Sequence, residues 1–148
     1  MNLYLDTCCY SRPFDDQGQE RIYLESEAVL SIVKRGRLGK DIIVGSDVLE
    51  LEMSMIANVE KRDKITILYQ IATTLVRFSS EIEKRAKAIS EKSSIRSFDA
   101  LHIACAEYGE VDYMLTTDDK LKKAADKQKL SIEVVNPLTY MAEVMKSE

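Results

Sequence analysis

Leu3-Tyr4-Leu5-Asp6, at the start of the chain, consists of three apolar residues followed directly by an aspartate. Short runs of this kind are typical of strands whose two faces are both buried in a parallel sheet. Further candidate strands lie at 42–44, 75–78, 113–115 and 132–135. Since helical segments separate these runs, we predict an α/β protein with a parallel sheet covered by helices on both faces.

The helical segments are recognised by apolar residues that recur every three or four positions. Ser46, Ser80 and Ser97 occupy positions typical of helix N-caps, and Gly36 and Gly39 are positioned to end the first long helix. The predicted helices cover about 19–35, 46–57, 61–74, 80–89, 97–108 and 119–129, with a loop over 12–16 and a last helix after residue 137.

The composition indicates a globular protein, and the 148 residues are the usual size of one domain, which we expect to span 1–148. Hydrophobic residues make up 45% of the chain and charged residues 31%, so disorder is disfavoured. The formal charge is −4. A protein that bound nucleic acid through lysine and arginine alone would be basic. A nucleic-acid role therefore requires a local basic patch, bound cations, or both.

The three cysteines, Cys8, Cys9 and Cys105, form neither a disulfide framework nor a CxxC zinc motif. The first residues lack the basic region and apolar run of a signal peptide. No apolar stretch approaches the roughly 20 residues of a membrane span. We therefore expect a cytoplasmic protein with reduced thiols and no membrane segment.

Two acids follow predicted strands directly or closely, Asp6 after the first strand and Asp118 after the fourth. Ligand sites in parallel sheets lie at the carboxyl ends of the strands. Each acid also has a purely structural interpretation, because Asp6 could form a turn and Asp118 could cap a helix.

Glu52 lies on the apolar face of the helix predicted after Ser46, whereas Glu50 lies on the opposite, water-facing side. An unpaired carboxylate that is buried costs several kcal/mol or becomes protonated. A bound cation would remove that cost, and so would a neighbouring arginine. The apolar face itself is predicted from Val48, Leu49, Leu51, Met55 and Ile56.

Asp99 lies in the first turn of the helix predicted after Ser97, which is apolar on nearly every side and should be buried. The helix dipole alone could favour an aspartate there. His102 shares this helix, and we expect it to be a packed or hydrogen-bonded core residue. Two strand-end acids and two inward-facing helix acids together predict a site for a hard cation such as Mg²⁺ or Mn²⁺.

Four short motifs in this order and spacing resemble the PIN-domain nucleases, which include the VapC-type toxin ribonucleases of prokaryotic toxin–antitoxin pairs. The motifs are Leu5-Asp6-Thr7, Ser46 followed six residues later by Glu52, the run Asp99–Ala104, and Leu115-Thr116-Thr117-Asp118. The resemblance covers nearly the whole chain. It implies a Rossmann-like three-layer α/β/α fold with a parallel sheet of about five strands, and Mg²⁺- or Mn²⁺-dependent hydrolysis of RNA phosphodiester bonds.

The resemblance also assigns roles to individual residues. Asp6, Glu52, Asp99 and Asp118 take the family's acidic catalytic positions and would hold one or two metal ions. Asp119 is an alternative ligand to Asp118. The resemblance further makes Thr116 a supporting hydroxyl near this site.

The resemblance extends to partners, since it implies an RNA substrate, an antitoxin protein and a homodimer. Met53-Ser54-Met55 is a candidate interface segment, or else part of the core. One alternative is a catalytically inactive PIN-like module that binds RNA or a protein. A phosphoryl-transfer enzyme with an aspartate nucleophile is disfavoured, because Cys8 stands where that chemistry commonly needs a second aspartate. Candidate contacts to the RNA backbone are Arg12, Arg21, Lys34, Arg35, Arg37 and Arg96.

Overall fold

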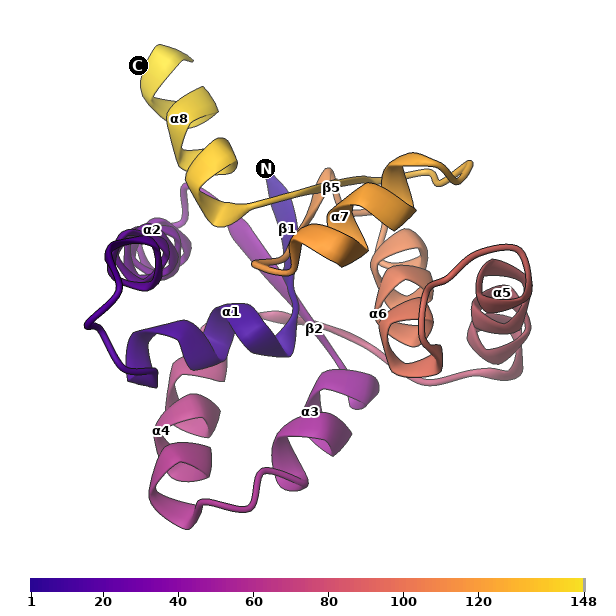
Figure 1. The fold of residues 1–148 in the computed structure, drawn as a ribbon, viewed down its shortest axis with the longest axis horizontal. Coiled ribbons are helices and arrows are strands. Elements are labelled where there is room, and N and C mark those ends of the chain that lie inside the picture. Colours follow the sequence, from indigo (N-terminus) through magenta and orange to yellow (C-terminus); the bar gives the residue numbers. More distant parts are fainter. Residues whose placement is uncertain (148) are drawn as a thin grey trace.

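A computed structural model describes residues 1–147 and contains a parallel sheet with helices on both sides (Figure 1). The five strands are β1 (Asn2–Leu5), β2 (Ile42–Ser46), β3 (Thr74–Val76), β4 (Tyr113–Leu115) and β5 (Glu133–Val135). Their order in the sheet is β3-β2-β1-β4-β5, and every neighbouring pair is parallel. The predicted Rossmann-like three-layer α/β/α fold with about five strands is confirmed.

The central position of β1 explains its apolar sequence. Tyr4 pairs with Val44 on one side and with Met114 on the other, and Leu3, Tyr4 and Leu5 have no exposed surface. The chain leaves β1 toward β2 and β3 and later returns to its other side as β4 and β5. Such a reversal opens a crevice at the carboxyl ends of the two strands that flank it. The segments after β1 and β4 therefore meet at one place.

The helices lie on the two sides of this sheet. In Figure 1, α2 and α8 lie on one side of the strands, while α5 and α6 lie on the other. The helices are α1 (Thr7–Ser11), α2 (Glu20–Arg37), α3 (Asp47–Ser54), α4 (Val59–Tyr69), α5 (Ser80–Glu91), α6 (Ser97–Tyr108), α7 (Asp119–Asp126) and α8 (Pro137–Ser147), and Arg12–Phe14 form a 3₁₀ turn. None of the helices within residues 1–147 combines the length and hydropathy needed to cross a bilayer.

Several helix ends differ from the sequence-based prediction. The prediction of a loop over 12–16 was wrong for Arg12–Phe14, which form a 3₁₀ turn directly after α1. Gly36 lies inside α2 rather than ending it. Its missing side chain leaves room for the side chains of Ile43 and Ile71, which pack against it. Gly39 does follow the helix end, with a φ of 74° that favours glycine.

The N-caps show how local competition decides a helix start. Ser46 caps α3 as predicted, and its Oγ accepts a hydrogen bond from the Leu49 amide at 3.0 Å. The cap of α5 is Ser79 rather than Ser80, because the Ser79 hydroxyl accepts from an amide of the first turn. The cap of α6 is Arg96 rather than Ser97, which is already helical.

The apolar face of α3 is narrower than predicted. Leu51 and Met55 are 55% and 57% exposed, whereas Val48, Leu49 and Met53 are buried. α3 ends at Ser54, so Met55 lies beyond the regular helix and does not follow its periodicity. Met53 therefore belongs to the core, and the homodimer stays a prediction.

We predict that Gly45→Ala lowers the free energy of unfolding by about 1–3 kcal/mol, the usual cost of overpacking a core. A Cβ at Gly45 in β2 would overlap the Tyr69 hydroxyl and its ring carbons, so the whole ring would have to move. Urea denaturation measures the change. The control is Gly18→Ala, where the only close neighbour is the exposed Asp16 side chain, and its change should stay within about 0.5 kcal/mol. Equal stability of Gly45→Ala and the wild type would contradict this packing.

Candidate functional site

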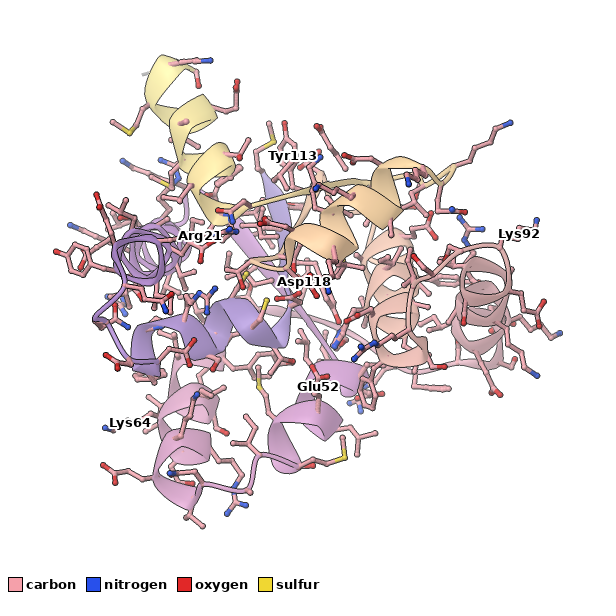
Figure 2. The ribbon with its side chains drawn as sticks, in the orientation of Figure 1. Arg21, Glu52, Lys64, Lys92, Tyr113 and Asp118 are labelled. Carbon is pink, nitrogen blue, oxygen red and sulfur yellow. The ribbon has the colours of Figure 1, made fainter. Side chains whose placement is uncertain are left out.

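The carboxyl edge of the sheet carries a cavity of about 350 Å³ into which the predicted acids point. Asp6, Glu52, Asp99 and Asp118 all line it, and they come from the end of β1, from α3, from α6 and from the start of α7. Figure 2 shows Glu52 and Asp118 approaching this central region from different elements. Their function as metal ligands stays a prediction.

Asp6 is the most buried of the four acids, at 5% exposure. It caps α1, since its Oδ1 accepts hydrogen bonds from the Cys9 amide at 3.2 Å and from the Cys8 thiol at 2.6 Å. Burial raises the pKa of the Asp6 carboxyl well above its usual range, and the neighbouring Cys8 raises it further. A hydrogen bond from Thr116 acts in the opposite direction. The structural role and the predicted ligand role are thus compatible, because the cap uses only one of the two oxygens.

Glu52 is half-buried, and two donors hold it in place. His102 Nε2 lies 2.9 Å from Glu52 Oε1, and the Thr7 hydroxyl donates to the same oxygen. Burial raises the pKa of Glu52, but the hydrogen bonds from His102 and Thr7 outweigh it, so that the pKa is lowered overall. The alternative of an arginine partner was wrong, because the partner is His102. Glu52 Oε2 accepts no hydrogen bond within residues 1–147 and is free to bind a cation.

A chain of hydrogen bonds runs from Ser46, at the end of β2, to Glu52 on α3. Tyr4 Oη lies 2.7 Å from Ser46 Oγ and 2.7 Å from His102 Nδ1. An ionised Glu52 can only accept, so His102 Nε2 donates, and Nδ1 of the neutral ring accepts from Tyr4. Tyr4 in turn accepts from Ser46. Burial raises the pKa of Tyr4 well above its usual value, which keeps the hydroxyl protonated as a donor.

Asp99 has the fewest hydrogen-bond partners of the four carboxylates. It makes no hydrogen bond within residues 1–147, although it is half-buried. Its pKa is raised by burial and by the negative charges of Asp118 and Glu52, while His102 and Arg96 lower it. In the absence of a cation, the acids of this cavity therefore repel one another.

Asp118 is both a helix cap and a cavity residue. Its Oδ1 accepts from the amides of Lys120 at 2.9 Å and Leu121 at 3.2 Å, and Oδ2 accepts no hydrogen bond from the described residues. Asp119 points elsewhere, with its two oxygens 2.7 and 2.8 Å from the guanidinium of Arg21, and does not line the cavity. This geometry favours Asp118 over Asp119 as the ligand.

Thr116 is buried beneath the site, where its hydroxyl accepts from the amide of Asp118 at 3.1 Å. The same hydroxyl hydrogen-bonds the Asp6 carboxylate and lies 3.6 Å from Cys8 Sγ. It thus connects the two strand-end segments, and its supporting role in the site stays a prediction.

The four carboxylates form a donor set that suits a hard divalent cation. Among the described residues, the group of three whose candidate ligand atoms lie within 4.8 Å of one another is Asp6, Cys8 and Cys9. Cys9 is a poor ligand, since burial raises its thiol pKa well above the usual value and its Sγ donates to the Leu115 carbonyl at 3.3 Å. The four carboxylates are more widely spaced. Mg²⁺ and Mn²⁺ suit such a set, because they take oxygen ligands and Mg²⁺ retains several waters.

Sequence reasoning placed the four acids but missed their hydrogen-bond partners. His102 is a hydrogen-bonded core residue, as expected, and it also lines the acidic cavity. The sequence contained a signal that His102 lies at the cavity, because His102 follows Asp99 by three residues and so shares its helix face. Thr7 and Cys8 follow Asp6 directly, but nothing in the sequence indicated which residues they would contact.

Comparison with known proteins gives a family match and several similar folds. A model of the PIN domain matches residues 3–127. VapBC2 from Rickettsia felis, solved with a fragment of promoter DNA, is 15% identical with a TM-score of 0.56 over 92% of this chain and 98% of that one. FitAB bound to the IR36 DNA fragment is 20% identical with a TM-score of 0.57, over 92% and 95%.

A third similar structure is VapC20 from Mycobacterium tuberculosis, described as a Sarcin-Ricin loop cleaving toxin. It is 12% identical with a TM-score of 0.57, over 82% of this chain and 93% of that chain. At these identities the three likenesses show the fold alone. A comparison with proteins of curated function gave no match.

We predict that His102 carries its proton on Nε2 when the ring is neutral. It is the only histidine in the chain, so ¹⁵N-histidine labelling gives a spectrum of this residue alone, and the two ring nitrogen shifts identify the tautomer. Tyr4→Phe removes the donor to Nδ1 and should cost about 1–3 kcal/mol of stability, because it leaves buried polar groups unsatisfied. A proton on Nδ1, or no response of that nitrogen's shift to Tyr4→Phe, is incompatible with the chain of donors.

Proposed function

The chain belongs to the PIN domain family, and on that premise we propose that it is a divalent-metal-dependent endoribonuclease that hydrolyses RNA phosphodiester bonds. The observation that carries the proposal is the convergence of Asp6, Glu52, Asp99 and Asp118 on one cavity at the carboxyl edge of the sheet. Four elements each supply one carboxylate, and a bound cation would remove the cost of burying Asp6 and Asp99.

The side chains around the cavity would hold the ions and keep their ligands oriented. Asp6 and Asp118 each use one oxygen to cap a helix and can present the other to an ion. His102 and Thr7 hold Glu52 by Oε1, which fixes the direction of Oε2. Mg²⁺ or Mn²⁺, as one or two ions, would supply Lewis-acid catalysis of an in-line displacement at phosphorus.

We further propose that the protein is the toxin of a toxin–antitoxin pair, with an antitoxin protein as partner. This proposal is supported by the fold shared with VapBC2, with FitAB and with a toxin that cleaves the Sarcin-Ricin loop. A homodimer and a cytoplasmic location belong to the same proposal.

The alternative is an inactive PIN-like module that binds RNA or a protein without turnover. A module of that kind has no need for a full set of four acids in one cavity, nor for the hydrogen bonds that hold Glu52 in its ionised form. The two functions differ in one observable, which is metal-dependent cleavage.

We predict that purified protein cleaves a mixed RNA pool with Mg²⁺ or Mn²⁺ but not with EDTA, and that Asp6→Asn and Glu52→Gln each reduce the rate by at least about 100-fold. The expected loss exceeds that caused by changing a residue that only supports a metal ligand. Gel electrophoresis of the RNA measures cleavage.

The matched control is Glu60→Gln, the same chemical change at a glutamate of α4 whose side chain is 82% exposed, and it should cleave as the wild type does. Asp118→Asn should be inactive and Asp119→Asn active. Cleavage by Asp6→Asn at the wild-type rate, or no cleavage by the folded wild type with either metal, would count against the proposal.

A further inference from the structure

Two hollows continue the acidic cavity along α7. The first, of about 420 Å³, shares Asp99 and Asp118 with the acidic cavity and is also lined by Arg96 and Lys120. The second, of about 480 Å³, shares Ser94, Lys120 and Ala124 with the first. Because each hollow shares lining residues with the next, the three are neighbours in a row that leads away from the acids, and we call this row the trough.

The far part of this trough is strongly basic in a protein whose formal charge is −4. Four of its eight described lining residues are lysines and none is acidic. The eight are Lys92, Ser93, Ser94, Lys120, Lys123, Ala124, Lys127 and Gln128. Lys120, Lys123 and Lys127 are spaced so that they share one face of α7 and its C-terminal end. Figure 2 shows Lys92 on the side of the molecule toward which α7 runs from Asp118.

Of the basic residues that the sequence first suggested, Arg96 lines the trough, whereas three others pair with acids elsewhere. Arg12 and Arg21 both pair with the buried Glu25, and Arg35 pairs with Asp41. Their charges are therefore largely neutralised inside the protein. Within residues 1–147, by contrast, no ion pair is formed by the basic residues of the trough, which are Lys92, Arg96, Lys120, Lys123 and Lys127.

We propose that this lysine-lined trough binds the backbone of the RNA strand on one side of the scissile phosphate, which lies among the four acids. The proposal rests on the proposed ribonuclease function. A polyanion is repelled by the acidic cavity, and the lysines offset that repulsion along the path that leads to it. Lysine binds phosphate as a mobile point charge and reads no base. The trough should therefore set the affinity and direction of the strand rather than its sequence.

The opposite side of the acidic cavity is less suited to this task. Its basic residue there is Lys61, whose ammonium group lies 2.7 Å from Asp15 and is already paired. The described charges thus favour one side of the cavity, so the strand should extend mainly along α7.

The test is the binding of a fluorescent single-stranded RNA to metal-free protein in EDTA, where cleavage does not interfere. We expect the double variant Lys123→Glu, Lys127→Glu to bind at least about tenfold more weakly at 0.1 M salt. Its plot of log affinity against log salt should be less steep by about 1.4, since each lost phosphate contact to a single strand contributes about 0.7.

The control variant is Lys122→Glu, Lys146→Glu, which changes the net charge equally. Lys122 lies on α7 but pairs with Asp126, and Lys146 lies on α8. It should keep nearly the wild-type affinity and slope. In cleavage assays the trough variant should raise KM and leave kcat unchanged.

Equal losses in both double variants would show a net-charge effect and overturn the trough, as would an absence of RNA binding by the wild type at low salt. If the trough variant kept its affinity for RNA but lost binding of a polyglutamate peptide, the trough would be a protein-binding site, and the proposal would also be overturned. Because binding is measured without metal, failure of the nuclease proposal is distinguishable: trough-dependent RNA binding would persist while no metal-dependent cleavage occurred.

Discussion

The burial of carboxylates beside one another at the carboxyl edge of the sheet is the constraint on which the rest of this structure depends. Asp6 is buried at the end of the central strand, and Asp99 is half-buried without a hydrogen bond from the described residues. Burial raises the pKa of both groups. Ionisation of these two carboxyls is therefore disfavoured in the folded protein. A cation is the ligand that would remove this cost.

The fold imposes this arrangement through its topology. Strands β2 and β3 lie on one side of β1 and strands β4 and β5 on the other, so the segments after β1 and β4 bring Asp6 and Asp118 to one cavity. Helices α3 and α6 supply Glu52 and Asp99 to the same cavity. The buried chain from Ser46 through Tyr4 and His102 fixes Glu52 to the sheet. The same topology directs α7 away from the acids, and this places basic charge beside them without raising the net charge of the protein.

Sequence pattern predicted the strands and the four acids because both are local signals, such as an apolar run followed by a carboxylate. It could not predict the partners of His102, since Tyr4 and Glu52 meet it only after three separate elements have packed. Apart from Arg96, the sequence did not indicate which basic residues form no ion pair within residues 1–147. Arg12 and Arg21 looked available, but the buried Glu25 binds both, and such pairing depends on tertiary contacts. The predicted N-caps of α5 and α6 each lie one residue from the observed cap, because neighbouring residues compete for the same amides.

The measurement that tests the acidic site most directly is the free energy of unfolding of the wild type and Asp99→Asn at pH 7, in EDTA and with Mn²⁺. Because the pKa of Asp99 is raised, the stability it contributes is lost as pH rises through its folded pKa, and asparagine avoids that loss. The variant should be the more stable protein in EDTA. Mn²⁺ at about 100 times its Kd should stabilise the wild type by about 2.7 kcal/mol and the variant by less. A variant that is less stable in EDTA, with the same gain from Mn²⁺ as the wild type, would contradict the account.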